Sequence, residues 1–201
     1  TLNEGVHFLE GEAAHNIARK ALRVNLSDLA SMGAKPLCYQ LNIAFAEKPE
    51  EAWLSAFSKA LQEDNTLYDV YCSGGDTTSI KGQFLSISIT AMGLVPRGAA
   101  VRRGGAKEGD VLLVTGAIGD AVLGLKAIRA AAADDYAGAV SRYQLPQPRM
   151  DVHDIVQKYA HAAADVSDGL LADSMNIAKA SGLGLEIDPS KTPLSKDVQL
   201  A

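Results

Sequence analysis

The chain has 201 residues, of which 47% are hydrophobic and 21% charged, a balance typical of a folded globular protein and not of a disordered one. Its formal net charge is −5, with no run rich in lysine or arginine, which argues against binding to nucleic acid through phosphate contacts. The sequence contains no recognisable signal peptide and no apolar run of about 18 residues, so we expect a cytoplasmic protein.

The cysteines and the two chain ends add two further expectations. Cys38 and Cys72 lie inside strand-like segments, and the four histidines are dispersed, so no CxxC pair or Cys/His cluster predicts a zinc site. We expect two reduced, mostly buried thiols. The chain starts at Thr1 without a methionine and stops at Ala201, so we expect a fragment of a longer polypeptide.

The first half of the chain is predicted to alternate between helices and strands. Apolar residues at helical spacing predict a helix over residues 15–34. Strict alternation over residues 37–46 predicts a strand with one buried face. Pro49 and the two acids after it begin a second helix, whose apolar stripe starts at Trp53.

Two more strands are predicted before residue 100. A short strand over residues 68–72 leads directly into the segment SGGD at residues 73–76. A strand over residues 84–92 alternates apolar residues with Ser86, Ser88 and Thr90. This hydroxyl-bearing face is either solvated or paired with the sheet of another subunit.

The composition changes around residues 104–110. After this boundary, strands are predicted over residues 111–115, 162–166 and 183–187, and helices from about 119 to 133, over 151–161 and over 168–180. A proline-bearing connection is predicted over residues 134–150. The interpretation is an α+β protein of two modules, residues 1–106 and 107–201.

Four polar segments are candidates for chemistry, and the first is NLSD at residues 25–28. Asp28 lies in an otherwise apolar helix, so it is either a solvated residue or a carboxylate that needs a partner or a metal. Its neighbours Leu26 and Leu29 make a fully exposed position unexpected. The second segment is GGDTT at residues 74–78, where the glycines either form a tight turn or let the backbone approach a ligand closely.

The third and fourth segments are DVSDG at residues 165–169 and VRRGGA at residues 101–106. Asp165 is predicted to end a strand, and Ser167 or Asp168 to cap the following helix. Two carboxylates at a helix N-terminus otherwise indicate a metal placed between the protein and an anion. The arginines beside the glycines either form a phosphate fork or a solvated turn.

The common nucleotide and nucleophile motifs are absent from the sequence. It has no G-x-x-x-x-G-K-[ST] loop, no G-x-G-x-x-G after a strand and no GxSxG elbow. Acidic residues at loops and element ends, together with an arginine, fit a polyphosphate that is held through Mg²⁺. The combination indicates a nucleotide site.

Taken together, these segments resemble the thiamine-monophosphate kinase family, of the superfamily that includes aminoimidazole ribonucleotide synthetase. The most specific matches are EGVHF at residues 4–8 and NLSDLASMGA at residues 25–34. The other matches follow in family order: GGDTT at 74–78, GLVP at 93–96, RGGA at 103–106, GD at 109–110, VTG at 114–116 and DVSDGL at 165–170.

The resemblance implies an ATP- and Mg²⁺-dependent transfer of phosphate to thiamine monophosphate, giving thiamine diphosphate and ADP. The Mg²⁺ ligands it implies are Asp28, Asp76, Asp165 and Asp168. The residues it implies for ATP are Gly75, Asp76, Arg103 and Ser167. It further implies that His7 contacts thiamine monophosphate, that the N-terminal module dimerises through a mixed or antiparallel sheet, and that the C-terminal module is α/β and incomplete here.

Two departures and two alternatives accompany this interpretation. The acidic stretch that the family has before Glu4 is missing, and its C-terminal substrate-pocket residues would lie beyond Ala201. One alternative is another ATP-dependent synthetase of the superfamily, acting in purine or selenophosphate biosynthesis. The other is a non-catalytic nucleotide-binding maturation protein on the same fold, and phosphate transfer that depends on thiamine monophosphate separates these functions.

Overall fold

The structure is a computed structural model that describes residues 1–82 and 84–201. Its strands are β1 (Leu2–Asn3), β2 (Lys35–Phe45), β3 (Tyr71–Ser79) and β4 (Ser86–Leu94). Its α-helices are α1 (Ala14–Ser31), α2 (Glu51–Tyr68), α3 (Asp120–Arg129), α4 (Ala137–Gln144), α5 (His153–Tyr159), α6 (Leu170–Ser181) and α7 (Lys196–Leu200). Short 3₁₀ turns are η1 (Asp134–Tyr136), η2 (Met150–Val152) and η3 (Pro189–Lys191). None of the helices described is long and apolar enough to cross a bilayer.

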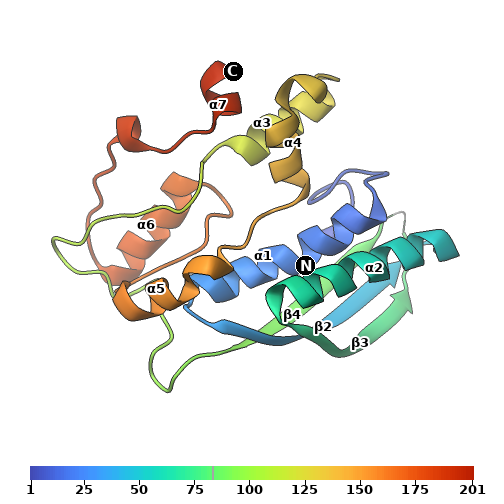
Figure 1. Cartoon of the computed structure of the whole chain (residues 1–201), viewed down its shortest axis with the longest axis horizontal. Coiled ribbons are helices and arrows are strands. Elements are labelled where there is room, and N and C mark those ends of the chain that lie inside the picture. The colour runs from blue at the N-terminus through green and yellow to red at the C-terminus, as the bar shows by residue number, and fades with distance from the viewer. Residues whose placement is uncertain (83) are drawn as a thin grey trace.

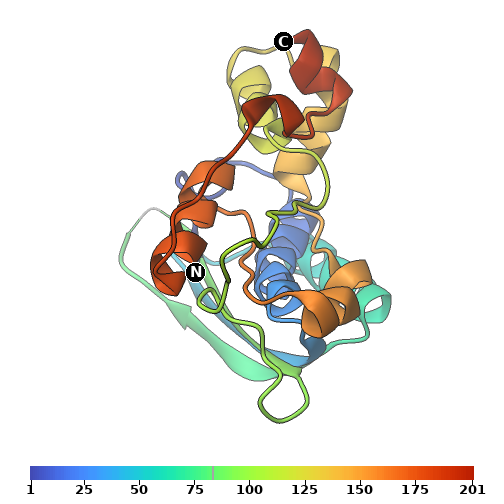
Figure 2. The ribbon, with the colours of Figure 1, turned by 90° about the vertical axis from the view of Figure 1, so that its left-hand side faces the viewer.

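The N-terminal half is a mixed four-stranded sheet with two helices on one face. The strand order is β1-β4-β2-β3, in which β2 pairs parallel with β3 and antiparallel with β4, and β1 pairs antiparallel with β4. Helices α1 and α2 lie side by side over the same face of this sheet (Figures 1 and 2). The α+β prediction, with a mixed sheet in the N-terminal half, is confirmed.

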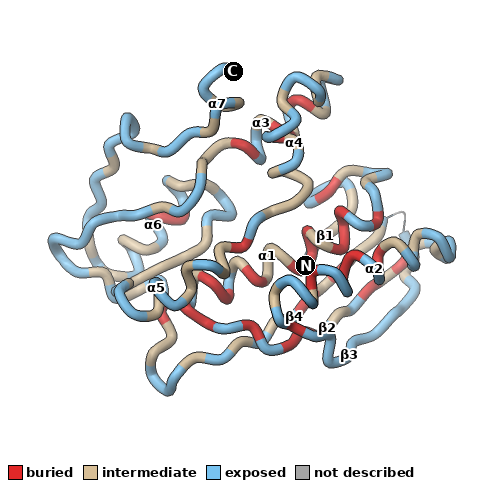
Figure 3. Tube along the Cα trace, in the orientation of Figure 1, coloured by how far each residue is buried: buried red, intermediate tan, exposed pale blue. Residues whose placement is uncertain are grey.

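The core lies between this sheet and the two helices because the predicted apolar stripes face each other. Tyr39 and Ile87 on the strands and Leu22 and Leu26 on α1 are fully buried, and buried residues concentrate along these elements (Figure 3). Complete burial of one such side chain stabilises the fold by about 2 kcal/mol. The helix predicted over residues 15–34 and the strands predicted over 37–46 and 84–92 are confirmed within three residues at each end.

The strand predicted at residues 68–72 is confirmed only at Tyr71 and Cys72, where β3 begins, and the tight-turn alternative for GGDTT is wrong. Helix α2 continues to Tyr68 and ends at Asp69, which has left-handed backbone torsions (φ 51°). Strand β3 then carries the whole GGDTT segment in extended form beside β2. A Cβ atom on Gly75 would lie 1.8 Å from the carbonyl oxygen of Leu41. The glycine is therefore required by the close approach of two strands.

This packing predicts a large effect of Gly75→Ala on stability. The added methyl group overlaps the β2 backbone, and φ at Gly75 is +152°, a torsion that L-residues rarely adopt, so the free energy of unfolding should fall by about 3 kcal/mol. Urea denaturation followed by circular dichroism measures the change. Gly184→Ala is the matched control, because a Cβ at Gly184 meets no atom within 4 Å. Equal stability of the two variants would contradict this account.

The second half of the chain, described in full, consists of helices joined by irregular segments, and it lacks the three strands that the sequence predicted. In residues 107–201, all of which the structure describes, β-pairing is limited to an isolated bridge between Ile118 and Leu194. The strands predicted over residues 111–115, 162–166 and 183–187 are therefore wrong for this structure. Their alternating apolar residues favour an extended backbone, but a strand also needs a hydrogen-bonded neighbour, and these segments have none. Val111 and Leu113 are accordingly 78% and 84% exposed.

The connection predicted over residues 134–150 contains a helix that the sequence interpretation missed. Helix α4 occupies residues up to Gln144, and Pro146 and Pro148 follow its end. Prolines past a helix C-terminus are common and do not interrupt the helix before them. Tyr143 of α4 lies under the ammonium group of Lys20 on α1, 4.0 Å from ring centroid to nitrogen, which joins the two halves of the chain.

Candidate functional site

The candidate site forms where α1 meets the loop before α6. Asp165 lies in that loop, and burial together with the nearby carboxylates of Asp28 and Asp173 raises its pKa to about 6. A hydrogen bond with the side chain of Ser27 acts in the opposite direction. Two of the predicted metal ligands, distant in the sequence, are therefore close enough to repel each other electrostatically. A bound cation would relieve this repulsion.

Of the two alternatives for Asp28, the structure has the solvated one, because Asp28 is exposed on α1 while Leu26 and Leu29 on either side of it are buried. The helical period explains the difference, since the two leucines turn towards the sheet and Asp28 turns away from it. An exposed carboxylate needs no buried partner. Its position beside Asp165 is thus available to a ligand from solvent.

The loop at residues 165–169 is organised by a residue that the sequence interpretation did not select. Neither Ser167 nor Asp168 caps α6; the N-cap is Gly169, whose φ is 121°. Instead Asp173, in the first turn of α6, accepts hydrogen bonds at Oδ2 from the backbone N–H groups of Ser167, Asp168 and Gly169. An acidic residue in a helix first turn that reaches back to preceding amides is the signal that could have found it.

The third predicted metal ligand, Asp76, lies on the opposite face of the sheet. It is in register with Asn42 of β2, which in turn pairs with Ser88 of β4. These three side chains line a shallow hollow on the face that α1 and α2 leave uncovered. Among the described residues, no group of three or more His, Cys, Asp or Glu side chains is arranged to hold a metal ion. The four predicted aspartates are therefore not gathered at one point of this chain.

The RGGA segment at residues 103–106 packs against the end of α6 and against the strand-like segment before Asp165. The backbone N–H groups of Gly105 and Ala106 both donate to Oγ of Ser181, at 3.2 and 3.1 Å. The carbonyl of Arg102 accepts a hydrogen bond from the N–H of Ala163 at 3.0 Å. Arg103 is exposed beside this connection. The glycines thus serve close packing, and the arginine is left accessible near the chain segment that leads to Asp165.

His7 closes a turn at the edge of the sheet. Its Nδ1 accepts the backbone N–H of Asn3 at 2.9 Å, so in the neutral ring the proton is on Nε2. The ring is exposed, which leaves Nε2 available as a donor. Glu4 in the same motif accepts the backbone N–H of Leu85 through Oε2 at 3.1 Å. The EGVHF segment is therefore a fixed turn that presents one imidazole.

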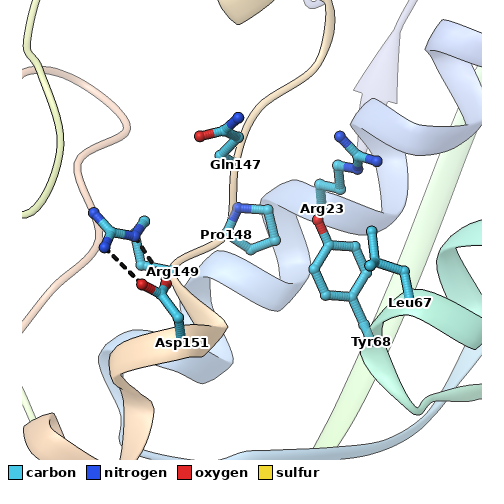
Figure 4. Close-up of a pocket in the computed structure, with 7 residues that line it drawn as sticks. All are labelled: Arg23, Leu67, Tyr68, Gln147, Pro148, Arg149 and Asp151. Carbon is cyan, nitrogen blue, oxygen red and sulfur yellow. Dashed lines mark hydrogen bonds and ion pairs between the residues drawn. The ribbon is translucent and has the colours of Figure 1, made fainter.

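A separate hollow of about 450 Å³ lies between α1, the end of α2 and the segment before η2 (Figure 4). It is lined by Arg23, Leu67, Tyr68, Gln147, Pro148, Arg149 and Asp151. Arg149 makes a two-point ion pair with Asp151, and Arg23 makes one with Asp64. Both guanidinium groups are thus neutralised within the chain. None of the predicted site residues lines this hollow.

Two family models match almost the whole chain: the N-terminal domain of AIR synthase related proteins over residues 1–95, and the C-terminal domain over residues 107–201. Thiamine-monophosphate kinase of Caulobacter vibrioides is 45% identical over 97% of this chain and 55% of its own length. The crystal structure of the Aquifex aeolicus thiamine-monophosphate kinase is 31% identical, with a TM-score of 0.91 over 99% of this chain and 67% of that one. The chain belongs to the thiamine-monophosphate kinase family.

A further solved structure of this family, AaThiL complexed with AMPPCP and TMP, superimposes with a TM-score of 0.86 at 29% identity. The superposition covers 99% of this chain and 64% of the AaThiL chain. The chain therefore spans a little over half to two thirds of the length of the thiamine-monophosphate kinases that it matches. The family resemblance deduced from the motifs is confirmed.

Proposed function

We propose that the full-length protein is a thiamine-monophosphate kinase, which transfers the γ-phosphoryl group of ATP to thiamine monophosphate and releases thiamine diphosphate and ADP. Membership of the family and the complex of AaThiL with an ATP analogue and TMP support this reaction. The observation in this chain that carries the proposal is the pair of carboxylates, Asp28 and Asp165, held together where α1 meets the loop before α6. We also propose a cytoplasmic location.

The donor set of this loop fits Mg²⁺. Carboxylate oxygens are the ligands that Mg²⁺ prefers, and the pKa of Asp165 is raised by burial and by the nearby carboxylates of Asp28 and Asp173, whose negative charge a cation would balance. Asp28 and Asp165 would hold the metal together with water molecules, Asp168 of the same loop is the proposed further ligand, and Ser167 and Arg103 would contact the nucleotide. When bound, Mg²⁺ neutralises phosphate charge and so permits two polyanions to approach each other. Gly75 and Asp76 of β3 are the further proposed nucleotide contacts, and Asp76, on the other face of the sheet, is also a proposed metal ligand.

No residue of the chain needs to act as a strong general base. The acceptor is a phosphate monoester with a second pKa of about 6, so it is already largely ionised at neutral pH. The Nε2–H of His7 would donate a hydrogen bond to this phosphate, and Arg103 would stabilise charge on the transferred group. Catalysis then depends on positioning the two substrates and on neutralising their charge, as is usual in phosphoryl transfer.

A second copy of the chain is the proposed partner of the uncovered sheet face. This face carries the hydroxyl groups of Ser86 and Ser88 and the side chains of Met92 and Leu94, which are 38% and 57% exposed. A dimer formed there would complete the surroundings of Asp76. The boundary between an N-terminal module (1–106) and a C-terminal module (107–201) remains a proposal, supported by the two family models that match residues 1–95 and 107–201.

Sedimentation equilibrium of the full-length protein tests the dimer. Met92→Asp places a charge in the proposed interface and should raise the Kd of the dimer at least 10-fold, because an unpaired charge is costly to bury. Leu67→Asp is the control, since Leu67 is 66% exposed on α2, away from that face. A monomeric wild type, or a dimer unaffected by Met92→Asp, would contradict the proposal.

A coupled ADP-release assay with Mg·ATP tests the reaction itself. ADP formation should require thiamine monophosphate and should not occur with unphosphorylated thiamine, which has no phosphate group to accept the transferred phosphoryl group. ADP formation indifferent to thiamine monophosphate would favour another synthetase of the superfamily. Nucleotide binding without turnover on any of these substrates would favour a non-catalytic maturation protein.

A further inference from the structure

Asp173 is a buried carboxylate with an unusual set of partners. Its exposed fraction is only 6%, and one oxygen, Oδ2, accepts three backbone N–H groups in succession. The distances are 2.9 Å from Ser167, 3.0 Å from Asp168 and 3.2 Å from Gly169. A charged acceptor makes each of these bonds about twice as strong as a neutral one. The carboxylate therefore fixes the backbone of three consecutive residues.

The first consequence concerns the side chains of this loop. With their amides turned towards Asp173, Ser167 and Asp168 have exposed side chains, and Asp165 remains beside Asp28. Gly169 holds a φ of +121°, a torsion for which glycine is suited, although a Cβ there would meet no atom within 4 Å. The glycine thus serves the bend that brings the three amides onto one oxygen.

The second consequence concerns the chemistry at the N-terminus of α6. Free N–H groups at a helix N-terminus usually bind anions such as phosphate directly. Here the three amides just before and at the N-cap are already hydrogen-bonded within the protein. Phosphate oxygens therefore cannot bind these three amides directly and have to reach this part of the loop through its side chains or through a cation held by its carboxylates.

We propose that Asp173 is a positioning residue of the nucleotide site, which holds the loop at residues 165–169 in its metal-binding form and withholds the loop amides from metal-free phosphate. This inference rests on the proposed function, because it assumes that the loop binds a metal–nucleotide complex. In this proposal Asp173 makes no contact with substrate. Asp173 determines whether the loop prefers metal-bound or metal-free nucleotide.

The test measures binding, separately from activity, in the full-length protein. AMPPCP is titrated with Mn²⁺ and, in parallel, in EDTA, against wild type, Asp173→Ala and Asp173→Asn. In Asp173→Ala the affinity for Mn·AMPPCP should fall at least 10-fold, as is usual when a group supporting metal ligands is lost, whereas the affinity for metal-free AMPPCP should stay the same or rise. Hydrogen exchange at the amides of residues 167–169 should accelerate in the same variant.

Two controls keep the result specific. Asp173→Asn retains an acceptor oxygen of the same shape, so it should recover most of the exchange protection and at least part of the Mn·AMPPCP affinity. Asp188→Ala removes an exposed aspartate that accepts the N–H of Ser190 in η3, far along the chain from the loop, and should change neither binding curve. Circular dichroism confirms that each variant is folded.

Two outcomes would overturn the positioning role: unchanged Mn·AMPPCP affinity in folded Asp173→Ala, or a parallel loss of metal-free and metal-bound affinity. Thiamine monophosphate turnover by the wild type is measured alongside. Absent turnover combined with the expected Asp173 effect would overturn the proposed function and leave the positioning role supported. Normal turnover without the Asp173 effect would overturn the positioning role alone.

Discussion

Asp165→Asn is expected to abolish phosphoryl transfer while making the metal-free protein more stable. The carboxylate lies beside Asp28 and Asp173, and its pKa is raised to about 6, so at neutral pH it is ionised in an environment that disfavours its charge. Losing this charge removes a proposed metal ligand and should lower activity at least about 100-fold. It also removes repulsion from the folded state, so thermal unfolding in EDTA at pH 7 should occur at a higher temperature.

The pH dependence of stability follows from the same shift. Because the pKa of Asp165 in the folded protein lies above its ordinary value of 3.8, the folded state binds more protons than the unfolded state between about pH 4 and pH 6. Its contribution to stability is therefore largest at low pH and is lost as the pH rises through about 6. In Asp165→Asn this loss should be absent.

Thermal unfolding in EDTA across this pH range, together with the ADP-release assay, measures both effects. Asp154→Asn is a suitable control, because Asp154 is exposed at the start of α5, outside the candidate site. A variant that is inactive but no more stable than the wild type would contradict the electrostatic environment described for Asp165. A variant that keeps more than a tenth of the activity would contradict its metal role.

Asp64→Ala is expected to cost about 3 to 5 kcal/mol of the free energy of unfolding. The Asp64 side chain is 2% exposed on α2 and pairs at two points with Arg23 of α1, each at 2.7 Å. This hydrogen bond raises the pKa of the Arg23 guanidinium, which therefore stays charged. Removing one partner of a buried pair leaves the other charge uncompensated, and this is the source of the large cost.

Chemical denaturation at neutral pH measures the effect of Asp64→Ala. Its matched control is Glu63→Ala, the neighbouring acid, which pairs with Arg19 but is 48% exposed. Exposed pairs contribute at most about 1 kcal/mol, so this variant should be nearly as stable as the wild type. Similar losses in the two variants would show that burial of the Asp64 pair does not decide the stability of the α1–α2 contact.

The N-terminal half was predictable because its local patterns and its tertiary partners agree. The alternation over residues 37–46 and the stripe of α1 face each other across the core, so each element had a partner in the structure. The segment GGDTT was not predictable in this way. Local sequence favours a turn at Gly74 and Gly75, whereas the close approach of β2 makes the same residues part of a strand.

The second half and the site show two other limits of sequence reasoning. Residues 111–115 have the composition of a strand, but no neighbouring strand pairs with them in the described chain. The closeness of Asp28 and Asp165 depends on how α1 packs against the loop before α6, which no local spacing encodes. Asp173 was passed over because a single acid in a helix first turn is common and its three amide partners are visible only in the fold.

Phosphorus-31 NMR of the full-length protein with Mg·ATP and thiamine monophosphate tests the central claim most directly. We predict that the thiamine monophosphate signal is replaced by the two coupled phosphate signals of thiamine diphosphate, in step with the conversion of ATP to ADP. ATP hydrolysis to ADP and free phosphate, with the thiamine monophosphate signal unchanged, would contradict the assignment.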